Sequence, residues 1–451
     1  MKIICRVVLA VMAISFGMRV AAQQAGELEE HVGEEMEEAM QHYNEGVGFV
    51  EAEKLDQAQK AFEEALQKLG KRRDPDAKRL RAAAGNNMGN LWILQGHPDK
   101  AEPILREALE ADPEHALALS NLGVAVLQQG RLEEAVMLFE RARVADPEAV
   151  EPLKNLAELT LEMGKLRSAG EYTVAGLQRA PDDQRLLILL ATVYERAGKP
   201  ERQERVWQKL VESTDGSIES RLLLATYYLK QGIYAQAESI LNEILAERPD
   251  YPEAQLQRAR LLHATGSQTE AETLLRDLIN KQPEEEPVQS ELVRVLHDSG
   301  QNEDTLALAR ETVRKFPEDA EAWFVLGVCL ESAGAFQEAE DAYRKAIAQD
   351  VRHARALNNL GLLAARKNDL DGAVKHLTAA MVVDPLYTDA RYNLGRMLVI
   401  SKKDFERGVA LVAGVVGKGG ESAIKARAFL DDLKMIAEGK DPGWGVTGSA
   451  E

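Results

Sequence analysis

Apolar and small residues recur at helical spacing through the segment from Ala116 to Glu148. Intervals of three and four positions place such residues on one face of a helix. The first apolar stretch ends near Gly130, and a second stretch with the same spacing ends at Asp146-Pro147. Proline fixes its own φ and lacks a backbone N–H, so it ends a helix. The pattern therefore predicts two short helices joined by a tight turn.

The same pattern returns every 34 residues. The eighth residue of each unit is glycine or alanine except at Val293, and the thirty-second is usually proline. The units begin at residues 82, 116, 150, 184, 218, 252, 286, 320, 354 and 388.

This repeat predicts close helix packing within and between units. Two antiparallel helices approach closely only where one presents a small side chain, so Gly123 and Ala135 suit the crossing within a unit. Phe139 and Leu122 are expected to fill the space beside that crossing. Each unit alone leaves an apolar face exposed, and stacking of neighbours buries it. An internal repeat of this length therefore predicts one solenoid.

Two units carry the clearest family signature. Their signature residues are Trp323, Leu326, Gly327, Leu330, Gly334, Ala339, Tyr343 and Ala346 in one unit, and Met88, Gly89, Trp92, Gly96, Ala101, Ala108 and Pro113 in the other. On these residues the chain resembles the tetratricopeptide repeat (TPR) family over roughly residues 82 to 421. The resemblance implies an all-α fold, a right-handed α-α superhelical solenoid of TPR helix-turn-helix repeats, with a concave groove that binds a protein or peptide partner.

The first 22 residues differ from all that follow. Lys2 and Arg6 precede an apolar run from Val7 to Phe16, and small residues follow at Val20-Ala21-Ala22. This order is typical of a cleaved secretory signal peptide. The apolar run is short for a bilayer-spanning helix, although an uncleaved anchor is the alternative. We therefore predict a periplasmic or secreted protein with no integral membrane span after cleavage.

The remaining segments are assigned from composition and from their phase in the repeat. They are an acidic lead-in at 23–38, a degenerate TPR at 39–72, a linker at 73–81, ten TPR units at 82–421, a C-terminal capping helix at 422–438 and a flexible tail at 439–451. A cap is expected because the last apolar face of an array would otherwise meet water. The last unit gains one residue near Lys402-Lys403-Asp404. Basic residues around the linker indicate an exposed helix end, or alternatively a docking patch for an acidic surface.

Composition narrows the function further. The formal net charge of −19 argues against nucleic-acid binding, which normally needs a basic surface. Beyond the signal segment the one cysteine is Cys329, which cannot form an internal disulfide and is expected to be a small core residue.

No pattern of catalytic residues is found in the sequence. It has no HExxH pair and no GxSxG element. Gly417-Lys418-Gly419-Gly420 lacks the flanking residues of a phosphate loop. We therefore predict no enzyme, no cofactor and no metal.

The resemblance places the sixth residue of each unit on the inner groove. That residue is asparagine in five units: Asn87, Asn121, Asn155, Asn359 and Asn393. Each amide offers one acceptor and two donors, so a row of them suits the main chain of a peptide. The alternative is that asparagine is common at this place for local structural reasons. The same face carries apolar residues, among them Ile188, Leu222 and Phe324, which are either a partner-binding patch or part of the core.

These observations favour an exported TPR scaffold or adaptor that acts through its concave groove, in assembly or export at the cell envelope. The alternative is a non-catalytic subunit of an envelope polysaccharide-processing or peptidase complex. A third hypothesis, an enzyme with an unrecognised site, would require titratable groups that converge in a pocket.

Overall fold

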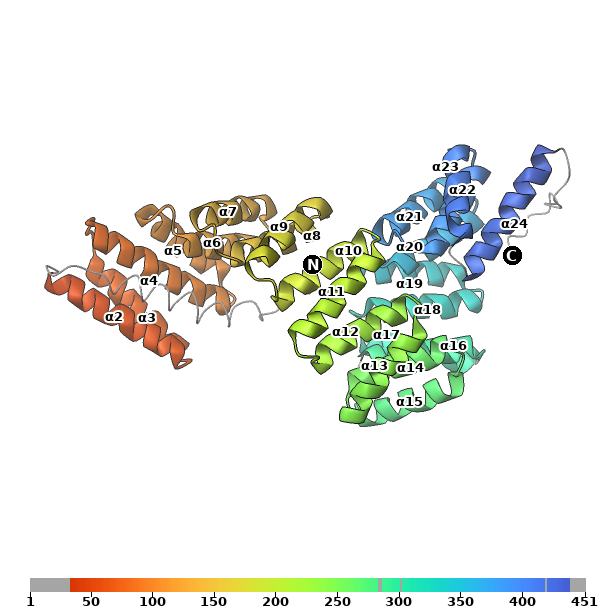
Figure 1. Cartoon of the computed structure of the whole chain (residues 1–451), viewed down its shortest axis with the longest axis horizontal. Helices are drawn as coiled ribbons and strands as arrows, with labels where there is room; N and C mark the ends of the chain where they lie inside the picture. Colours follow the sequence, from red (N-terminus) through yellow and green to blue (C-terminus); the bar gives the residue numbers. More distant parts are fainter. Residues whose placement is uncertain (1–32, 283–285, 301, 418–419, 439–451) are drawn as a thin grey trace. The chain divides into compact units, whose positions relative to one another are not determined.

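The computed structural model describes residues 33–282, 286–300, 302–417 and 420–438, and these form helices and turns alone (Figure 1). The chain divides into two compact units, Met1–Val193 and Tyr194–Glu451. The predicted signal peptide at 1–22 and the predicted tail at 439–451 lie outside the described residues.

The helices follow one another in pairs. The first unit contains α2 (Glu34–Glu51), α3 (Leu55–Leu69), α4 (Pro75–Leu94), α5 (Pro98–Ala111), α6 (Ala116–Gln128), α7 (Leu132–Ala145), α8 (Glu151–Glu162) and α9 (Leu166–Arg179). The boundary between the two units falls within α10 (Gln184–Arg196).

The second unit continues the same alternation. It contains α11 (Pro200–Ser213), α12 (Ile218–Lys230), α13 (Tyr234–Glu247), α14 (Pro252–Ala264), α15 (Gln268–Lys281), α16 (Glu286–Asp298), α17 (Asn302–Lys315), α18 (Ala320–Ser332), α19 (Phe336–Gln349), α20 (Ala354–Arg366), α21 (Leu370–Val383), α22 (Thr388–Ile400), α23 (Phe405–Val416) and α24 (Gly420–Ala437). Even-numbered helices up to α22 are the first helices of the repeats, and odd-numbered helices are the second.

Short turns hold each pair together. Three residues separate the two helices of a pair, as at 129–131, where Gly130 adopts φ +82°. Glycine has no Cβ and takes this left-handed conformation at little cost. The last pair differs, because residues 401–404 separate α22 from α23. This confirms the extra residue predicted near Lys402.

Close crossing explains the small residue at the eighth position. A Cβ placed on Gly123 would lie 2.5 Å from Cε1 of Phe139, well inside van der Waals contact. Phe139 is fully buried, and Leu122 is 1% exposed beside it. Gly327 and Tyr343 repeat the arrangement, with the same 2.5 Å approach. The packing predicted within the unit at 116 is therefore confirmed.

The stretch predicted as a linker at 73–81 is mostly helical. Asp74 accepts a hydrogen bond from the Ala77 amide, and Pro75 occupies the first turn of α4. Both are strong helix-start features, since an N-cap carboxylate satisfies a free N–H and proline needs no donor there. The nine extra residues thus lengthen α4 toward its N-terminus, and the prediction of a linker is wrong from Pro75 onward. Similarly, α2 begins at Glu34, within the segment predicted as an acidic lead-in.

Two further expectations concern the core and the end of the array. Cys329 is 5% exposed within a core cluster, and burial raises the pKa of its thiol to about 11. This confirms a packing role for Cys329. At the C-terminus α24 packs on α23, with Phe429 buried and Leu430 and Leu433 partly buried. Among the described residues no helix is both long and apolar enough to cross a bilayer.

Candidate functional site

The first helices of several neighbouring repeats contact one another directly. Such contacts join α4 to α6 in the first unit, and α12 to α14, α14 to α16, α16 to α18 and α20 to α22 in the second. No two second helices within the described residues contact each other to the same extent. The first helices therefore line the narrower side of each stack, which we call the inner face.

On this inner face, asparagines of the first unit form a buried chain of hydrogen bonds. Asn87 on α4 is 1% exposed, and its Nδ2 donates to the Tyr43 hydroxyl on α2 at 3.4 Å. Its Oδ1 accepts from Asn86 at 3.2 Å. Asn86 in turn accepts from Asn121 on α6 at 2.8 Å. One amide network thus connects three consecutive first helices.

An equivalent network lies eight repeats later, in the second unit. Asn359 donates to the Tyr343 hydroxyl at 3.0 Å and accepts from Asn358 at 3.1 Å. Asn393, which is 9% exposed, donates to Asn358 at 2.9 Å. The residue types and the order of donors match those around Asn87.

These contacts overturn the predicted peptide clamp for Asn87 and Asn393. Their amides are buried and already paired, so a peptide main chain cannot reach them without breaking the repeat packing. Asn121 and Asn359 are half-buried, and each uses one donor in the same networks. The local structural reason for asparagine at the sixth position is therefore a hydrogen bond to the neighbouring repeat.

Asn155 differs from the other four. It is half-buried on α8, and within the described part of the chain its amide makes no side-chain hydrogen bond. Asn90 on α4, which the sequence reasoning did not select, is in the same condition. Beside Asn155, Lys154 pairs with Asp183 at 2.6 Å and with Glu151 at 2.9 Å. Of the predicted asparagines, Asn155 is the one with its full hydrogen-bonding capacity left.

The three apolar residues predicted for the groove have different surroundings. Ile188 is 39% exposed and Leu222 is half-buried. Phe324 is 7% exposed, with its ring 5.8 Å from that of Tyr343 and 4.9 Å from that of His353. Phe324 is a core residue, and its assignment to an exposed patch is wrong.

The inner face of the second unit carries a connected set of ionisable side chains that the sequence reasoning missed. We call this set the charged row; its members are Arg260 and His263 on α14, Glu291, Arg294, His297 and Asp298 on α16, Glu321 on α18, and His353 and Arg355 at the start of α20. Successive pairs in the row join four first helices.

Glu291 is the buried centre of the charged row, at 2% exposure. Its carboxylate accepts from Arg260 Nε at 3.1 Å, lies 3.3 Å from His263 Nδ1 and pairs with Arg294. Burial opposes ionisation, but the hydrogen bond with His263 and the two guanidinium charges outweigh it and lower the pKa of Glu291. A buried carboxylate is retained in a fold only with such compensation.

Both ring nitrogens of His263 face carboxylates. Nε2 lies 2.9 Å from Asp298 and Nδ1 lies 3.3 Å from Glu291, so both nitrogens act as donors and the ring is an imidazolium. The hydrogen bond with Asp298, followed by that with Glu291, raises the pKa of His263 to about 9. Asp298 also contacts His297 at 2.9 Å, and His297 reaches Ser332 on α18 at 2.8 Å.

Glu321 continues the charged row toward α20. It lies within hydrogen-bond distance of Arg355, at 2.6 Å, and 3.3 Å from His353 Nε2. Burial raises the pKa of Glu321, but the hydrogen bond from His353 and the charges of Arg355 and Arg294 lower it to about 2. His353 Nδ1 accepts the Ala356 amide at 3.2 Å and so caps α20, which leaves Nε2 as the donor to Glu321.

The arginines of the charged row remain open to solvent. The side chains of Arg260, Arg294 and Arg355 are 34%, 29% and 41% exposed. Each guanidinium pairs with a glutamate, and its remaining N–H groups can donate to a carboxylate or a peptide carbonyl. A repeated signal for this site exists in the sequence: Arg-x-x-His at 260–263 recurs at 294–297, one unit later.

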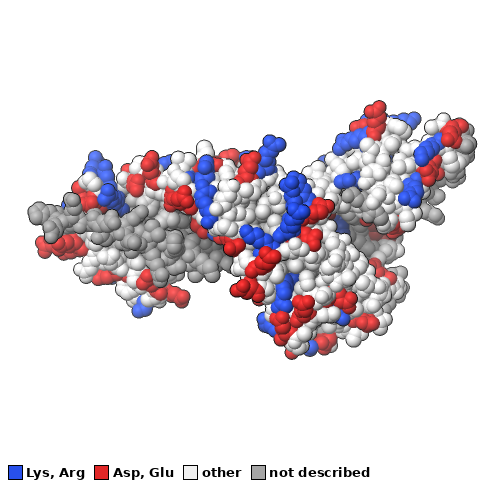
Figure 2. Space-filling view, viewed as in Figure 1, with Lys and Arg blue, Asp and Glu red and all other residues white. Residues whose placement is uncertain are grey.

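The described residues contain no cluster of histidine, cysteine or carboxylate side chains that could hold a metal. The polar groups of the charged row lie along the inner face and are paired with one another or, at His297, with the Ser332 hydroxyl. On the face shown in Figure 2, basic and acidic side chains are interspersed. The arrangement suits binding of a polypeptide.

Comparison with known proteins agrees with the repeat pattern. Two sequence models, both described as tetratricopeptide repeat, match the chain: one at residues 94–150, 291–350, 336–381 and 358–423, and the other at residues 126–191 and 228–293. No curated protein matches the sequence significantly.

Solved structures with a similar fold include yeast Tom70, with 16% identity over 89% of this chain and 96% of that chain and a TM-score of 0.42. Pseudomonas aeruginosa pilF has 20% identity over 47% of this chain and 96% of that chain, with a TM-score of 0.40. A tetratricopeptide repeat protein from Parabacteroides merdae has 17% identity over 67% of this chain and 99% of that chain, with a TM-score of 0.42.

Proposed function

The chain belongs to the tetratricopeptide repeat family, and we propose that it is an exported, non-catalytic scaffold that binds a protein partner along its inner face. The observation that carries this proposal is the charged row on α14, α16, α18 and α20. Its arginines are held in fixed positions by buried or half-buried carboxylates, yet their outer edges are exposed. Groups fixed in advance lose little conformational entropy when a partner binds.

Each unit has its own candidate binding surface. In the first unit, Asn90 and Asn155 contribute amides without side-chain partners in the described structure. In the second unit, the charged row contributes guanidinium groups. The formal charge of −19 supports a protein partner over nucleic acid.

Export rests on the sequence of residues 1–22, with its basic start, apolar run and small residues before Gln23. We propose the cell envelope as the setting, with a role in assembly or export there. Expression of the full chain in a Gram-negative host, followed by N-terminal sequencing of the periplasmic protein, tests this point. A mature N-terminus at Gln23 supports export, and retention of Met1 on a cytoplasmic product contradicts it.

The binding proposal is tested by affinity capture from envelope extract with a conservative variant of the charged row. Arg260→Lys, Arg294→Lys and Arg355→Lys together keep the positive charge beside Glu291 and Glu321 but remove the planar fork. The matched control is Arg276→Lys, Arg310→Lys and Arg344→Lys, three exposed arginines at equivalent positions on second helices. An Asn90→Ala, Asn155→Ala variant tests the first unit separately.

We expect the wild type and the second-helix control to retain the same partner, and the charged-row variant to bind it about tenfold more weakly. Circular dichroism of all variants provides the check on folding. Equal retention by the wild type and by both inner-face variants would contradict binding at the inner face.

A further inference from the structure

The repeat beginning at 252 breaks the pattern at its seventh residue. In the other nine units this residue is Met88, Leu122, Leu156, Leu190, Leu224, Leu292, Leu326, Leu360 or Leu394. Each of those eight leucines is buried. In the unit at 252 the residue is Arg258, whose guanidinium instead bonds Asn242 on α13. A charged side chain therefore stands here in the place of a buried leucine.

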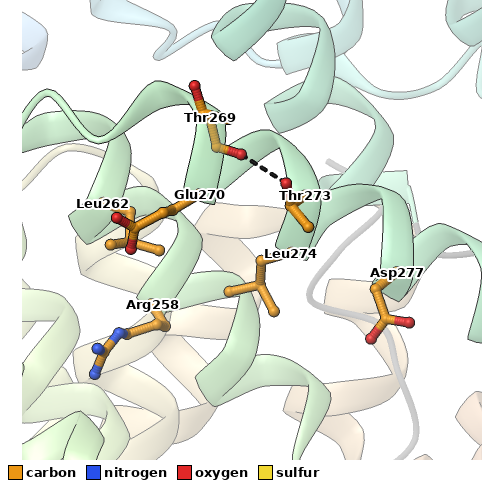
Figure 3. Close-up of a pocket in the computed structure, with 7 residues that line it drawn as sticks. All are labelled: Arg258, Leu262, Thr269, Glu270, Thr273, Leu274 and Asp277. Carbon is orange, nitrogen blue, oxygen red and sulfur yellow. Dashed lines mark hydrogen bonds between the residues drawn. The ribbon is translucent and has the colours of Figure 1, made fainter.

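A surface depression of about 460 Å³ lies at this place, between α14 and α15. Its lining is Arg258, Leu262, Thr269, Glu270, Thr273, Leu274 and Asp277. Figure 3 shows Leu274 in the middle of the group, with Glu270 and Leu262 on one side and Asp277 on the other. Leu274 thus lies between the two acidic side chains, with Leu262 beside Glu270.

Two of the three charged residues in the lining, Glu270 and Asp277, are acidic and lie on α15, so this side of the depression favours a basic partner. Glu270 has no hydrogen bond or ion pair within the described part of the chain, while Asp277 pairs with Lys281 at 2.8 Å. Glu270 and Asp277 are seven positions apart on one helix, which corresponds to about 10 Å along α15. A partner helix that carries a leucine with lysine or arginine three residues before it and four residues after it places its two charges at the same separation.

We propose that this depression is a second docking site, which takes a short amphipathic helix with one leucine between two basic residues. The leucine would lie against Leu262 and Leu274, with the basic residues beside Glu270 and Asp277. The site lies away from the charged row, because Arg258 and Arg260 are two positions apart and so point to nearly opposite sides of α14. The inference is therefore independent of the proposed inner-face function.

The test uses the full chain and a fluorescently labelled helical peptide of about 15 residues, with one central leucine and lysines three residues before and four residues after it. Binding is measured by fluorescence anisotropy at two salt concentrations. We expect saturable binding that weakens as salt is added, because the charges involved are exposed. A second peptide, with glutamate in place of both lysines, should bind at least about tenfold more weakly.

Two protein variants and two controls distinguish binding at the depression from non-specific binding. Arg258→Leu restores the residue type of the other repeats, where the leucine is buried, so the new side chain should occupy part of the depression and weaken peptide binding by about tenfold or more. Glu270→Gln with Asp277→Asn changes only exposed side chains and should weaken binding and remove most of its salt dependence. Arg276→Leu, an equal change on α15 outside the depression, and the charged-row lysine variant should both bind as the wild type does.

Each contrary result overturns the proposal. These results are the absence of saturable binding to the wild type, equal binding of the two peptides, and unchanged affinity in Arg258→Leu or in the Glu270, Asp277 double variant. Loss of binding in the charged-row variant would place the peptide on the inner face and also exclude the depression. Thermal melts show whether Arg258→Leu folds, and the double variant tests the site even if it does not.

Discussion

At the scale of single residues, identical side chains in equivalent repeats have unequal roles. Asn87 is buried and paired, whereas Asn155 has no side-chain hydrogen bond in the described structure. The difference comes from the neighbours: Asn87 has Tyr43 and Asn86 within reach. A repeat pattern shows which residues share a position, but the partner of each amide depends on residues outside the pattern.

His263 provides a residue-scale prediction about pH. Its pKa in the folded chain, about 9, lies above its ordinary value of 6.5. A raised pKa means that protonation stabilises the fold, so this stabilisation is complete below pH 6.5 and is lost as the pH rises through 9. Glu321, whose pKa is lowered to about 2, acts in the opposite sense: its stabilisation is present above pH 4.5 and is lost as the pH falls toward 2.

We therefore expect the midpoint temperature of thermal unfolding to decrease as the pH is raised from 6.5 to 9. The substitution His263→Gln should remove most of this pH dependence. The amide of glutamine cannot provide two charged donors to Asp298 and Glu291. The control is His97→Gln, an exposed histidine with no carboxylate partner in the described residues. If His263→Gln retained the full pH slope of the wild type, the imidazolium bridge would not be the cause.

At the scale of helices, most of the architecture could be predicted from the sequence. The 34-residue phase locates the starts of the first helices, such as Ala116, Ala320 and Ala354, and the extra residue between α22 and α23. The N-terminal extension of α4 departs from the phase, and the Asp74-Pro75 cap was the signal for it. The recurring Arg-x-x-His at 260–263 and 294–297 was the one repeated signal for the charged row. The row could not be predicted in full, because the carboxylates Glu291, Asp298 and Glu321 come from different repeat positions and only packing brings them to these arginines and histidines.

The docking of α4 against α6 yields a prediction about the asparagine network. Asn86 joins the two helices by accepting from Asn121 and donating to Asn87. Asn86→Ala leaves buried polar groups without partners, which costs about 1–3 kcal/mol. We expect faster hydrogen exchange in α4 and α6 and a lower unfolding midpoint in urea. Asn155→Ala, whose amide has no such bonds, should change neither.

This comparison also decides between the two interpretations of the asparagines. If Asn86→Ala and Asn155→Ala were equally mild in their effect on stability, the network would not hold the repeats together. In that case the buried asparagines would need another explanation.

At the scale of the whole molecule, each repeat in a stack contacts only its neighbours. A repeat at either end therefore has a neighbouring repeat on one side only, and its other apolar face needs a different cover. At the C-terminal end, α24 covers Val412 and Val415 of α23, both of which are fully buried. The first helix of the described residues, α2, is similarly anchored, with Met36 at 1% exposure. Neighbouring repeats cover the apolar faces of an interior repeat on both sides, whereas the outer face of the last pair, α22 and α23, is covered by α24.

This dependence gives the last prediction, which concerns Phe429 on α24. Phe429 is 6% exposed and packs in a cluster with Val412, Val415 and Tyr392. Phe429→Ala should cost about 3 kcal/mol through lost burial and the cavity left behind. Because the repeats couple to neighbours only, hydrogen exchange should quicken in α22, α23 and α24 and remain unchanged in α2 to α9.

Ile424→Ala on the same helix is the control, since Ile424 is 73% exposed and its truncation removes little packing. Uniformly faster exchange in Phe429→Ala would mean that the array unfolds as one cooperative unit, and equal effects of the two substitutions would mean that α24 is not a cap.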